Sequence, residues 1–384
     1  MSVNENVLSA AAPVYEVTER GVRFTHFPVL DGLRGIAVLL VMACHLEFVI
    51  PQLHPLVKGG FLGVDVFFVL SGFLITSILL REQDKNGKIS LKNFYLRRFL
   101  RLTPAFWTFL ASLYFLGNYI LPRDQAKIIY EGNDFLYSLL YVINWDRALG
   151  AAAIGNLNHT WSLAIEEQFY IVWSVSLWFA FSRRLTRQNL VSFLGIFILV
   201  LVLWRAFRWT TGADLETLYY ATDARIDGLL IGCLASMLYC WRLLSNEFFA
   251  SRKFGFLALV SLIIALTILF SFSHQDVLLY LGMTSVFSLA IAVVILRLIA
   301  TRNTLFHKLL ENRGLRWVGC ISYALYLWHY ASFEFARKLL ASPAMQSLLG
   351  VTMAFAVATL SYFLIERPFL ALKDRLASQE PQNT

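Results

Sequence analysis

The chain has 384 residues, of which 58% are hydrophobic and only 15% are charged, and its mean hydropathy is +0.61. Soluble domains carry about 25% charged residues, so this composition excludes a single water-soluble domain and predicts a polytopic membrane protein surrounded by lipid. The net charge of +8 would favour nucleic acid as a partner of a soluble protein. Here the basic residues cluster between apolar runs, where they determine membrane topology, and we expect no nucleic-acid partner.

Ten apolar runs have the length of about 20 residues that a membrane-spanning helix needs. They cover residues 29–50, 61–80, 101–121, 161–182, 190–209, 225–241, 254–272, 278–299, 316–338 and 347–370. The apolar stretch 135–145 is too short to cross, so we expect it to lie re-entrant or along the interface. The predicted fold is all-α, with about ten transmembrane helices in one domain (27–372), an N-terminal segment (1–26) and a tail (373–384).

Lys and Arg are distributed unevenly between the two sides of these spans. If the N-terminus lies on side one, that side receives 23 of the 33 basic residues and the other side 9, with Arg34 inside the first span. Because positive charge accumulates on the cytoplasmic side, we expect both termini in the cytoplasm. The longest segment on the outer side is then 121–160.

The first span contains both Arg34 and His45. Eleven residues amount to three helical turns plus about 20°, so both side chains leave one face, roughly 16 Å apart along the axis. Ionisable groups inside a membrane are costly unless they face a polar interior, which makes them candidates for function. The alternatives are a cytoplasmic anchor for Arg34 and a packing role for His45. Asp31 lies one turn before Arg34 and is placed to pair with it.

The second span begins with Asp65, close in depth to His45. A carboxylate that holds the imidazole tautomer would complete a general base. The alternative is that Asp65 caps the helix or faces the outer interface. Ser71 and Gly72, further along, indicate close helix packing rather than a nucleophile.

Three arginines, Arg97, Arg98 and Arg101, precede the third span on the cytoplasmic side. Guanidinium groups bind phosphates in a bidentate manner, so a nucleotide-bearing cofactor or an anionic lipid headgroup would suit this cluster. Ordinary cytoplasmic positive charge is the alternative interpretation.

A second polar cluster begins at His159-Thr160-Trp161 and continues into the fourth span. Ser162, Glu166 and Tyr170 follow the spacing i, i+4, i+8 and form one polar stripe on a helix. Glu166 on this stripe is a candidate for an interior role. Further polar groups inside spans are Arg225, Asp227 and His329, each a weak signal alone. The histidines and cysteines form no metal-ligand spacing, so we expect no metal site.

Seven short motifs resemble, in order, those of the acyltransferase-3 family. They are Arg34-x10-His45 within Leu-Asp-Gly-Leu-Arg-Gly, Phe67-Phe68-x-x-Ser71-Gly72, Arg98-x-x-Arg101 before Pro104, Trp161-Ser162-Leu163-x-x-Glu166, Arg225-x-Asp227-Gly228, Ser322-Tyr323 through Trp328-His329, and Glu366-Arg367-Pro368. Together they extend over nearly the whole chain.

The resemblance implies an O-acyltransferase of the bacterial inner membrane. Such enzymes take an acyl group, commonly acetyl, from cytoplasmic acyl-CoA and place it on a hydroxyl of a glycan or a small molecule. It implies that His45 is the catalytic base, that Arg34 is required for function, and that Arg98 and Arg101 lie on the donor side. Because this chain ends soon after its last span, we expect the stand-alone form, without the SGNH-type domain that many members carry.

The residues and the resemblance together suggest one mechanism. The phosphates of acyl-CoA would lie near Arg97, Arg98 and Arg101, and its pantetheine arm would pass Arg34 to reach His45. Asp65 or Glu166 would orient the imidazole. We assign four further residues to substrate binding, namely His159, Trp161, Tyr170 and Ser71.

The acceptor stays open at the level of sequence. We expect a cell-surface glycan, with segment 121–160 contacting it because loops carry specificity. The alternatives are a small molecule such as a macrolide, or a lipid-linked sugar. A membrane transporter is the non-enzymatic alternative, since buried charges also line transport pathways.

Overall fold

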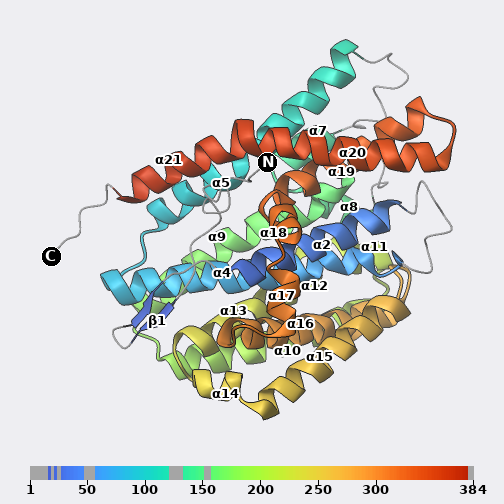
Figure 1. The fold of residues 1–384 in the computed structure, drawn as a ribbon. Coiled ribbons are helices and arrows are strands. Elements are labelled where there is room, and N and C mark those ends of the chain that lie inside the picture. Colours follow the sequence, from blue (N-terminus) through green and yellow to red (C-terminus); the bar gives the residue numbers. More distant parts are fainter. Residues whose placement is uncertain are drawn as a thin grey trace.

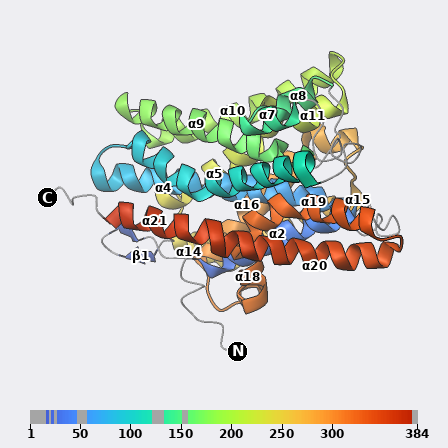
Figure 2. The same ribbon diagram turned by 90° about the horizontal axis from the view of Figure 1, so that it is seen from above.

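The computed structural model describes residues 16–18, 21–23, 27–46, 57–120, 133–150 and 157–378. These residues form a helical bundle whose long helices run side by side in roughly one direction (Figures 1 and 2). A short antiparallel pair of strands, β1 (Glu16–Thr18) and β2 (Gly21–Arg23), precedes the first helix. The predicted all-α, polytopic membrane fold is confirmed.

Each of the ten predicted spans overlaps a helix. These helices are α2 (Pro28–Leu46), α4 (Gly63–Asn86), α5 (Leu91–Phe115), α9 (Trp161–Ser182), α10 (Arg187–Thr210), α13 (Asp227–Cys240), α15 (Arg252–Ser271), α16 (Thr284–Ala300), α19 (Ser322–Leu339) and α20 (Pro343–Ser361). Span 316–338 is divided between the short α18 (Arg313–Cys320) and α19, and residues 47–50 and 121 lie outside the described ranges. Within the described ranges, 7 helical segments are long and apolar enough to cross a membrane. The other three are α13, which has only 14 residues, and α9 and α19, which carry more polar side chains.

Shorter helices connect the long ones or extend them. They are η2 (Gly60–Leu62), α7 (Asp134–Leu139), α8 (Ile143–Ala148), η4 (Asn158–Thr160), α11 (Leu215–Tyr220), α12 (Thr222–Arg225), α14 (Asn246–Ala250), α17 (Leu305–Leu310), α18 (Arg313–Cys320) and α21 (Arg367–Ser378), with π-helical turns at η3 (Leu116–Ile120), η5 (Leu279–Met283) and η6 (Tyr362–Glu366). Stretch 135–145 is divided between α7 and α8, each of 6 residues, too short to cross, as predicted. Because η6 joins α20 to α21, the last helix continues past residue 373, where we had placed the start of the tail.

A tight turn joins the C-terminal end of α4 to the start of α5. Gly87 closes α4 with a φ of +68°, a left-handed conformation that glycine adopts without steric cost. Ser90 then caps α5, because its Oγ accepts a hydrogen bond from the backbone N–H of Asn93 at 3.4 Å. The turn therefore brings Arg97 of α5 within 3.0 Å of Glu82 of α4.

The centre of the bundle is the contact between α4 and α13. A Cβ atom added to Gly72 would lie 1.9 Å from the carbonyl oxygen of Leu229, and one added to Gly232 would lie 2.1 Å from that of Val69. Only glycine allows the two backbones to approach this closely. The prediction of close helix packing at Gly72 is therefore confirmed.

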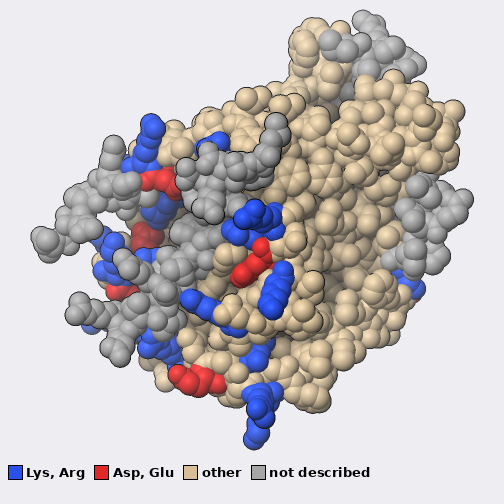
Figure 3. Space-filling view, in the orientation of Figure 1, with Lys and Arg blue, Asp and Glu red and all other residues tan. Residues whose placement is uncertain are grey.

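Basic side chains gather at one end of the bundle, which we call the basic end. On the face shown in Figure 3, Lys and Arg lie mainly where α4 and α21 end and over α17 and α18, whereas the opposite part is almost uncharged. The opposite end carries η2, α8, α11 and the start of α9. The bundle is thus polarised along the direction of its long helices.

Candidate active site

The structure contains a cavity of about 340 Å³ that starts at the basic end and extends into the bundle. This volume is in the range of small-molecule sites. Its walls come from α2, α4, α5, α9, α19 and the η6–α21 segment. Six basic side chains line it, namely Arg34, Arg81, Arg97, Arg98, Arg101 and Lys373. The four arginines that we predicted to bind a cofactor, Arg34, Arg97, Arg98 and Arg101, therefore share one cavity although they come from two helices.

Neighbouring groups hold these arginines in place. Arg97 forms an ion pair with Glu82 at 3.0 Å, and Arg34 pairs with Asp31 at 3.5 Å, as the i, i+3 spacing predicted. The guanidinium of Arg98 lies 3.8 Å from the centre of the Tyr170 ring, a cation–π arrangement. Tyr170, a predicted substrate-binding residue, thus supports an arginine of the cavity.

The cavity wall also carries Ser71, Ser162 and Glu166. Ser71 donates a hydrogen bond to Oε1 of Glu166 at 2.7 Å. The polar stripe predicted on α9 therefore faces this interior for Ser162 and Glu166. We expected Glu166 as one candidate to pair with His45, but the structure does not show this pairing. The Glu166 carboxylate faces Ser71 and the arginines of the cavity instead.

Tyr326 of α19 also lines the cavity. Its hydroxyl donates to the carbonyl oxygen of His159 at 2.7 Å and lies 2.6 Å from Oγ of Ser162. Because the single phenolic proton goes to the carbonyl, Ser162 is the donor in the second bond. Helices α9 and α19 are thereby joined at the wall of the cavity.

A pair of histidines lies directly behind Tyr326. Nε2 of His329 is 2.9 Å from Nδ1 of His45, and the His329 ring centre is 5.8 Å from that of Tyr326. The His159 ring lies 5.3 Å from His329 and is stacked on Tyr330. His159, predicted to bind substrate, therefore belongs to the aromatic surroundings of this histidine pair.

Asp65 requires a correction, because it does not orient His45. Both of its carboxylate oxygens accept hydrogen bonds from Nη2 of Arg225 at 3.0 Å, and both residues are buried. The guanidinium of Arg225 lies 5.6 Å from the Trp161 ring and 5.4 Å from the Tyr219 ring. A buried charge must be paired, so Asp65 is committed to Arg225, and Trp161, a predicted substrate-binding residue, packs against that pair.

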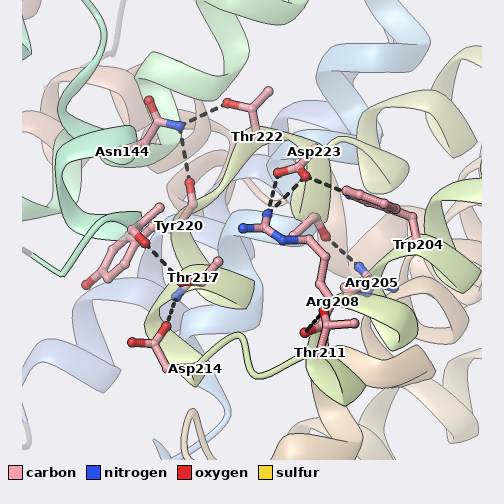
Figure 4. A network of polar contacts seen from close by, with 12 residues as sticks. Asn144, Trp204, Arg205, Arg208, Thr211, Asp214, Thr217, Tyr220, Thr222 and Asp223 are labelled. Atoms are coloured by element: carbon pink, nitrogen blue, oxygen red, sulfur yellow. Dashed lines mark hydrogen bonds and ion pairs between the residues drawn. The ribbon is translucent and has the colours of Figure 1, made fainter.

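A polar network fixes the segment that presents Arg225 (Figure 4). Asp223 accepts hydrogen bonds from Arg208 at 2.9 Å and from Trp204 at 2.7 Å. Nη1 of Arg205 donates to the carbonyl oxygen of Ala224 at 2.7 Å. Helix α12 is therefore anchored to α10 along its outer side.

The same network reaches α8 through Asn144. Its amide donates to the carbonyl oxygen of Tyr220 and to Oγ1 of Thr222. Burial raises the pKa of Tyr220 to about 12, so this phenol stays protonated at neutral pH. The predicted acceptor segment 121–160 contains α7, α8 and η4, which lie in this region of the structure. Residues 121–132 and 151–156 of the segment lie outside the described ranges.

Two residues of α19, Tyr326 and His329, were not among the predicted site residues. The signal was present, because they lie three residues apart on one helical face within the motif from Ser322 to His329. Their partners, however, come from α2 and α9, and no spacing along α19 indicates those contacts.

Comparison with known proteins supports an acyl-transfer function for this arrangement. Residues 27–367 match the family model described as an acyltransferase domain, acyltransferase-3. The chain belongs to this family. The resemblance of the seven motifs is thereby confirmed, and the helices and the cavity described above are those of a membrane-embedded acyltransferase domain. No solved structure is significantly similar to the chain.

Three relatives show where this acyltransferase domain occurs. The chain is 33% identical over 356 residues to "Peptidoglycan O-acetyltransferase OatA" of Listeria monocytogenes, covering 89% of this chain and 56% of that protein. It is 32% identical to "Putative peptidoglycan O-acetyltransferase YrhL" of Bacillus subtilis, with coverages of 89% and 55%. It is also 32% identical to "Putative O-acetyltransferase SACOL0978" of Staphylococcus aureus, with coverages of 90% and 58%. The chain thus spans a little over half the length of these relatives.

Proposed function

We propose that this protein transfers an acetyl group from acetyl-CoA, bound at the basic end, to a hydroxyl of a cell-surface glycan, with His45 as the general base. One observation carries the proposal: a single cavity is lined both by a cluster of arginines and by Tyr326, whose ring centre lies 5.8 Å from that of His329, the hydrogen-bond partner of His45. The relatives' names supply the acyl group and the glycan class. With the basic end facing the cytoplasm, as the distribution of Lys and Arg favours, the donor enters from the compartment where CoA is made.

The donor site suits a molecule with phosphates at one end and a thioester at the other. Arg97, Arg98 and Arg101 line the part of the cavity near the basic end, and guanidinium groups match phosphate oxygens. Beyond them, the wall changes to Phe67, Phe68 and other apolar side chains. In our proposal the pantetheine arm lies along this inner part, and the thioester comes against Tyr326.

The proposed chemistry needs one base and no redox partner. His45 removes the proton of the acceptor hydroxyl while its oxygen attacks the thioester carbonyl carbon. The C–O bond forms and the C–S bond breaks, and the departing sulfur takes the proton from the imidazolium. The products are the acetylated glycan and CoA with a free thiol, so protons and electrons balance.

Thiol release by the purified protein in lipid nanodiscs tests this proposal. With acetyl-CoA and soluble peptidoglycan fragments as the hydroxyl source, we expect release of free CoA and the appearance of acetylated fragments. His45→Ala should bind acetyl-CoA as the wild type does but release no thiol. Wild-type protein that binds acetyl-CoA and neither releases thiol nor acetylates fragments would contradict the proposal and favour a transporter.

Two matched arginine substitutions distinguish a specific role in donor binding from a general effect of positive charge. Arg101→Ala removes a guanidinium from the cavity wall. Arg187→Ala removes one from the exposed pair with Asp84. Only the first should weaken binding of acetyl-CoA.

A further inference from the structure

We propose that His329 is the positioning residue of His45: it fixes the ring so that Nδ1 carries the proton and Nε2 carries the lone pair that acts as the base. This inference rests on the proposed function, because it concerns the base of the proposed reaction. It assigns to a second histidine the role that catalytic sites commonly give to a carboxylate.

The tautomer of His329 follows from its own helix. Nδ1 of His329 lies 3.0 Å from the carbonyl oxygen of Leu325 and 2.8 Å from that of Tyr326. A carbonyl oxygen only accepts hydrogen bonds, so Nδ1 of His329 carries a proton. The ring is fully buried, and rings of Tyr326, Tyr330 and Phe333 surround it, so a second proton would create an uncompensated charge. Nε2 of His329 is therefore a lone-pair acceptor.

The tautomer of His45 follows from that of His329. Nδ1 of His45 is 2.9 Å from the acceptor Nε2 of His329, so it must supply the proton of this hydrogen bond. A neutral imidazole has one N–H, and Nε2 of His45 therefore holds the lone pair.

The two candidate carboxylates have other partners. His329 therefore takes the role of orienting His45. Asp65 is held by Arg225, and Glu166 faces Ser71 on the other side of Tyr326. When Nε2 of His45 takes up the acceptor's proton, the Nδ1–H bond to His329 becomes charge-assisted and stronger. His329, whose ring is oriented by two backbone carbonyls, thus keeps the base aligned before and after proton transfer.

Kinetics of two His329 variants test the proposal in the thiol-release assay. His329→Phe keeps a ring but offers no acceptor, and we expect kcat to fall about 10- to 100-fold with KM for acetyl-CoA within about twofold. His329→Gln supplies an amide oxygen as acceptor and should recover most of that loss. Ser332→Ala, one turn along the same helix with a hydroxyl bonded to the Trp328 carbonyl, is the matched control and should behave as wild type. Equal rates for all three variants would overturn the proposal.

The tautomers themselves are observable and do not depend on activity. In protein labelled with ¹⁵N-histidine, the signals of the two rings are identified by their loss in His45→Ala and His329→Phe. We expect a protonated Nδ1 and an unprotonated Nε2 for both, the opposite of the tautomer that free histidine prefers. A protonated Nε2 on His45 would refute the inference even if transferase activity is present, whereas the expected tautomers in a protein without transferase activity would refute only the proposed function. Should a variant fail to fold, the wild-type spectrum still decides, with His45→Ala assigning its own signal.

Discussion

Nε2 of His329 lies 2.9 Å from Nδ1 of His45, although 284 residues separate them along the chain. The contact exists because α19 packs directly against α2. It joins the first membrane helix to one near the end of the domain. The surroundings of His45, which the first motif singled out, are therefore formed only when α19 has packed against α2.

Asp65 should matter for folding rather than for proton transfer. Asp65→Asn leaves the buried Arg225 without a charged partner, and breaking a buried pair costs about 3–5 kcal/mol. We expect a large loss of thermal stability in detergent, while the pH dependence of thiol release by the remaining folded protein stays that of wild type. The control is Asp84→Asn, whose partner Arg187 is half exposed, and which should cost at most about 1 kcal/mol. A changed pH profile in Asp65→Asn would return this carboxylate to the role first expected for it.

Gly72 should tolerate no side chain. The Cβ of Gly72→Ala would lie 1.9 Å from the carbonyl oxygen of Leu229, so α4 and α13 would have to separate, at a cost of about 1–3 kcal/mol or more. We expect a lower melting temperature and a poor yield of monodisperse protein in size-exclusion chromatography. Gly195→Ala, in α10 with nothing within 4 Å, should be neutral or stabilise by up to about 1 kcal/mol. Similar behaviour of the two variants would contradict the packing argument.

Arg101 should contribute to donor binding through charge. Arg101→Ala removes a guanidinium that lines the cavity, and hydrogen bonds to charged groups are worth about 1.5–3 kcal/mol. We expect the Kd for acetyl-CoA, measured by calorimetry in nanodiscs, to rise roughly 10- to 100-fold, and its dependence on salt to weaken. If Arg101 contacts the 3′-phosphate, the substitution should weaken binding of acetyl-dephospho-CoA, which lacks that phosphate, less than binding of acetyl-CoA, whereas an equal loss for both donors would indicate a contact with the diphosphate. An unchanged Kd would exclude Arg101 from the donor site.

Tyr326 and Ser162 should act as one unit at the inner wall of the cavity. Tyr326→Phe removes the donor to the His159 carbonyl and the acceptor for Ser162, leaving buried polar groups unpaired at a cost of about 1–3 kcal/mol. Ser162→Ala removes only the second bond. In a double-mutant cycle we expect the destabilisation of the pair to be clearly less than the sum of the single variants. Additive effects would show that the two hydroxyls do not depend on each other.

The amino-acid sequence was sufficient to predict the membrane class, the ten helical segments and the basic end, because span length, hydropathy and the distribution of Lys and Arg are local properties. It also selected His45, Arg34 and Glu166, since ionisable groups in apolar helices stand out without any knowledge of their neighbours. The pairing of Arg34 with Asp31 was predictable for the same reason: both residues lie on one turn.

The group that each candidate side chain faces depends on how the helices pack, which the sequence pattern does not reveal. Depth in the membrane placed Asp65 near His45, but a helix has several faces, and the rotation of α4 against α12 and α13 turns this carboxylate to Arg225. The same packing turns α19 so that His329 meets His45. Periodicity fixes the residues that share a face of one helix, whereas the identity of the opposing helix depends on packing between segments far apart in the chain.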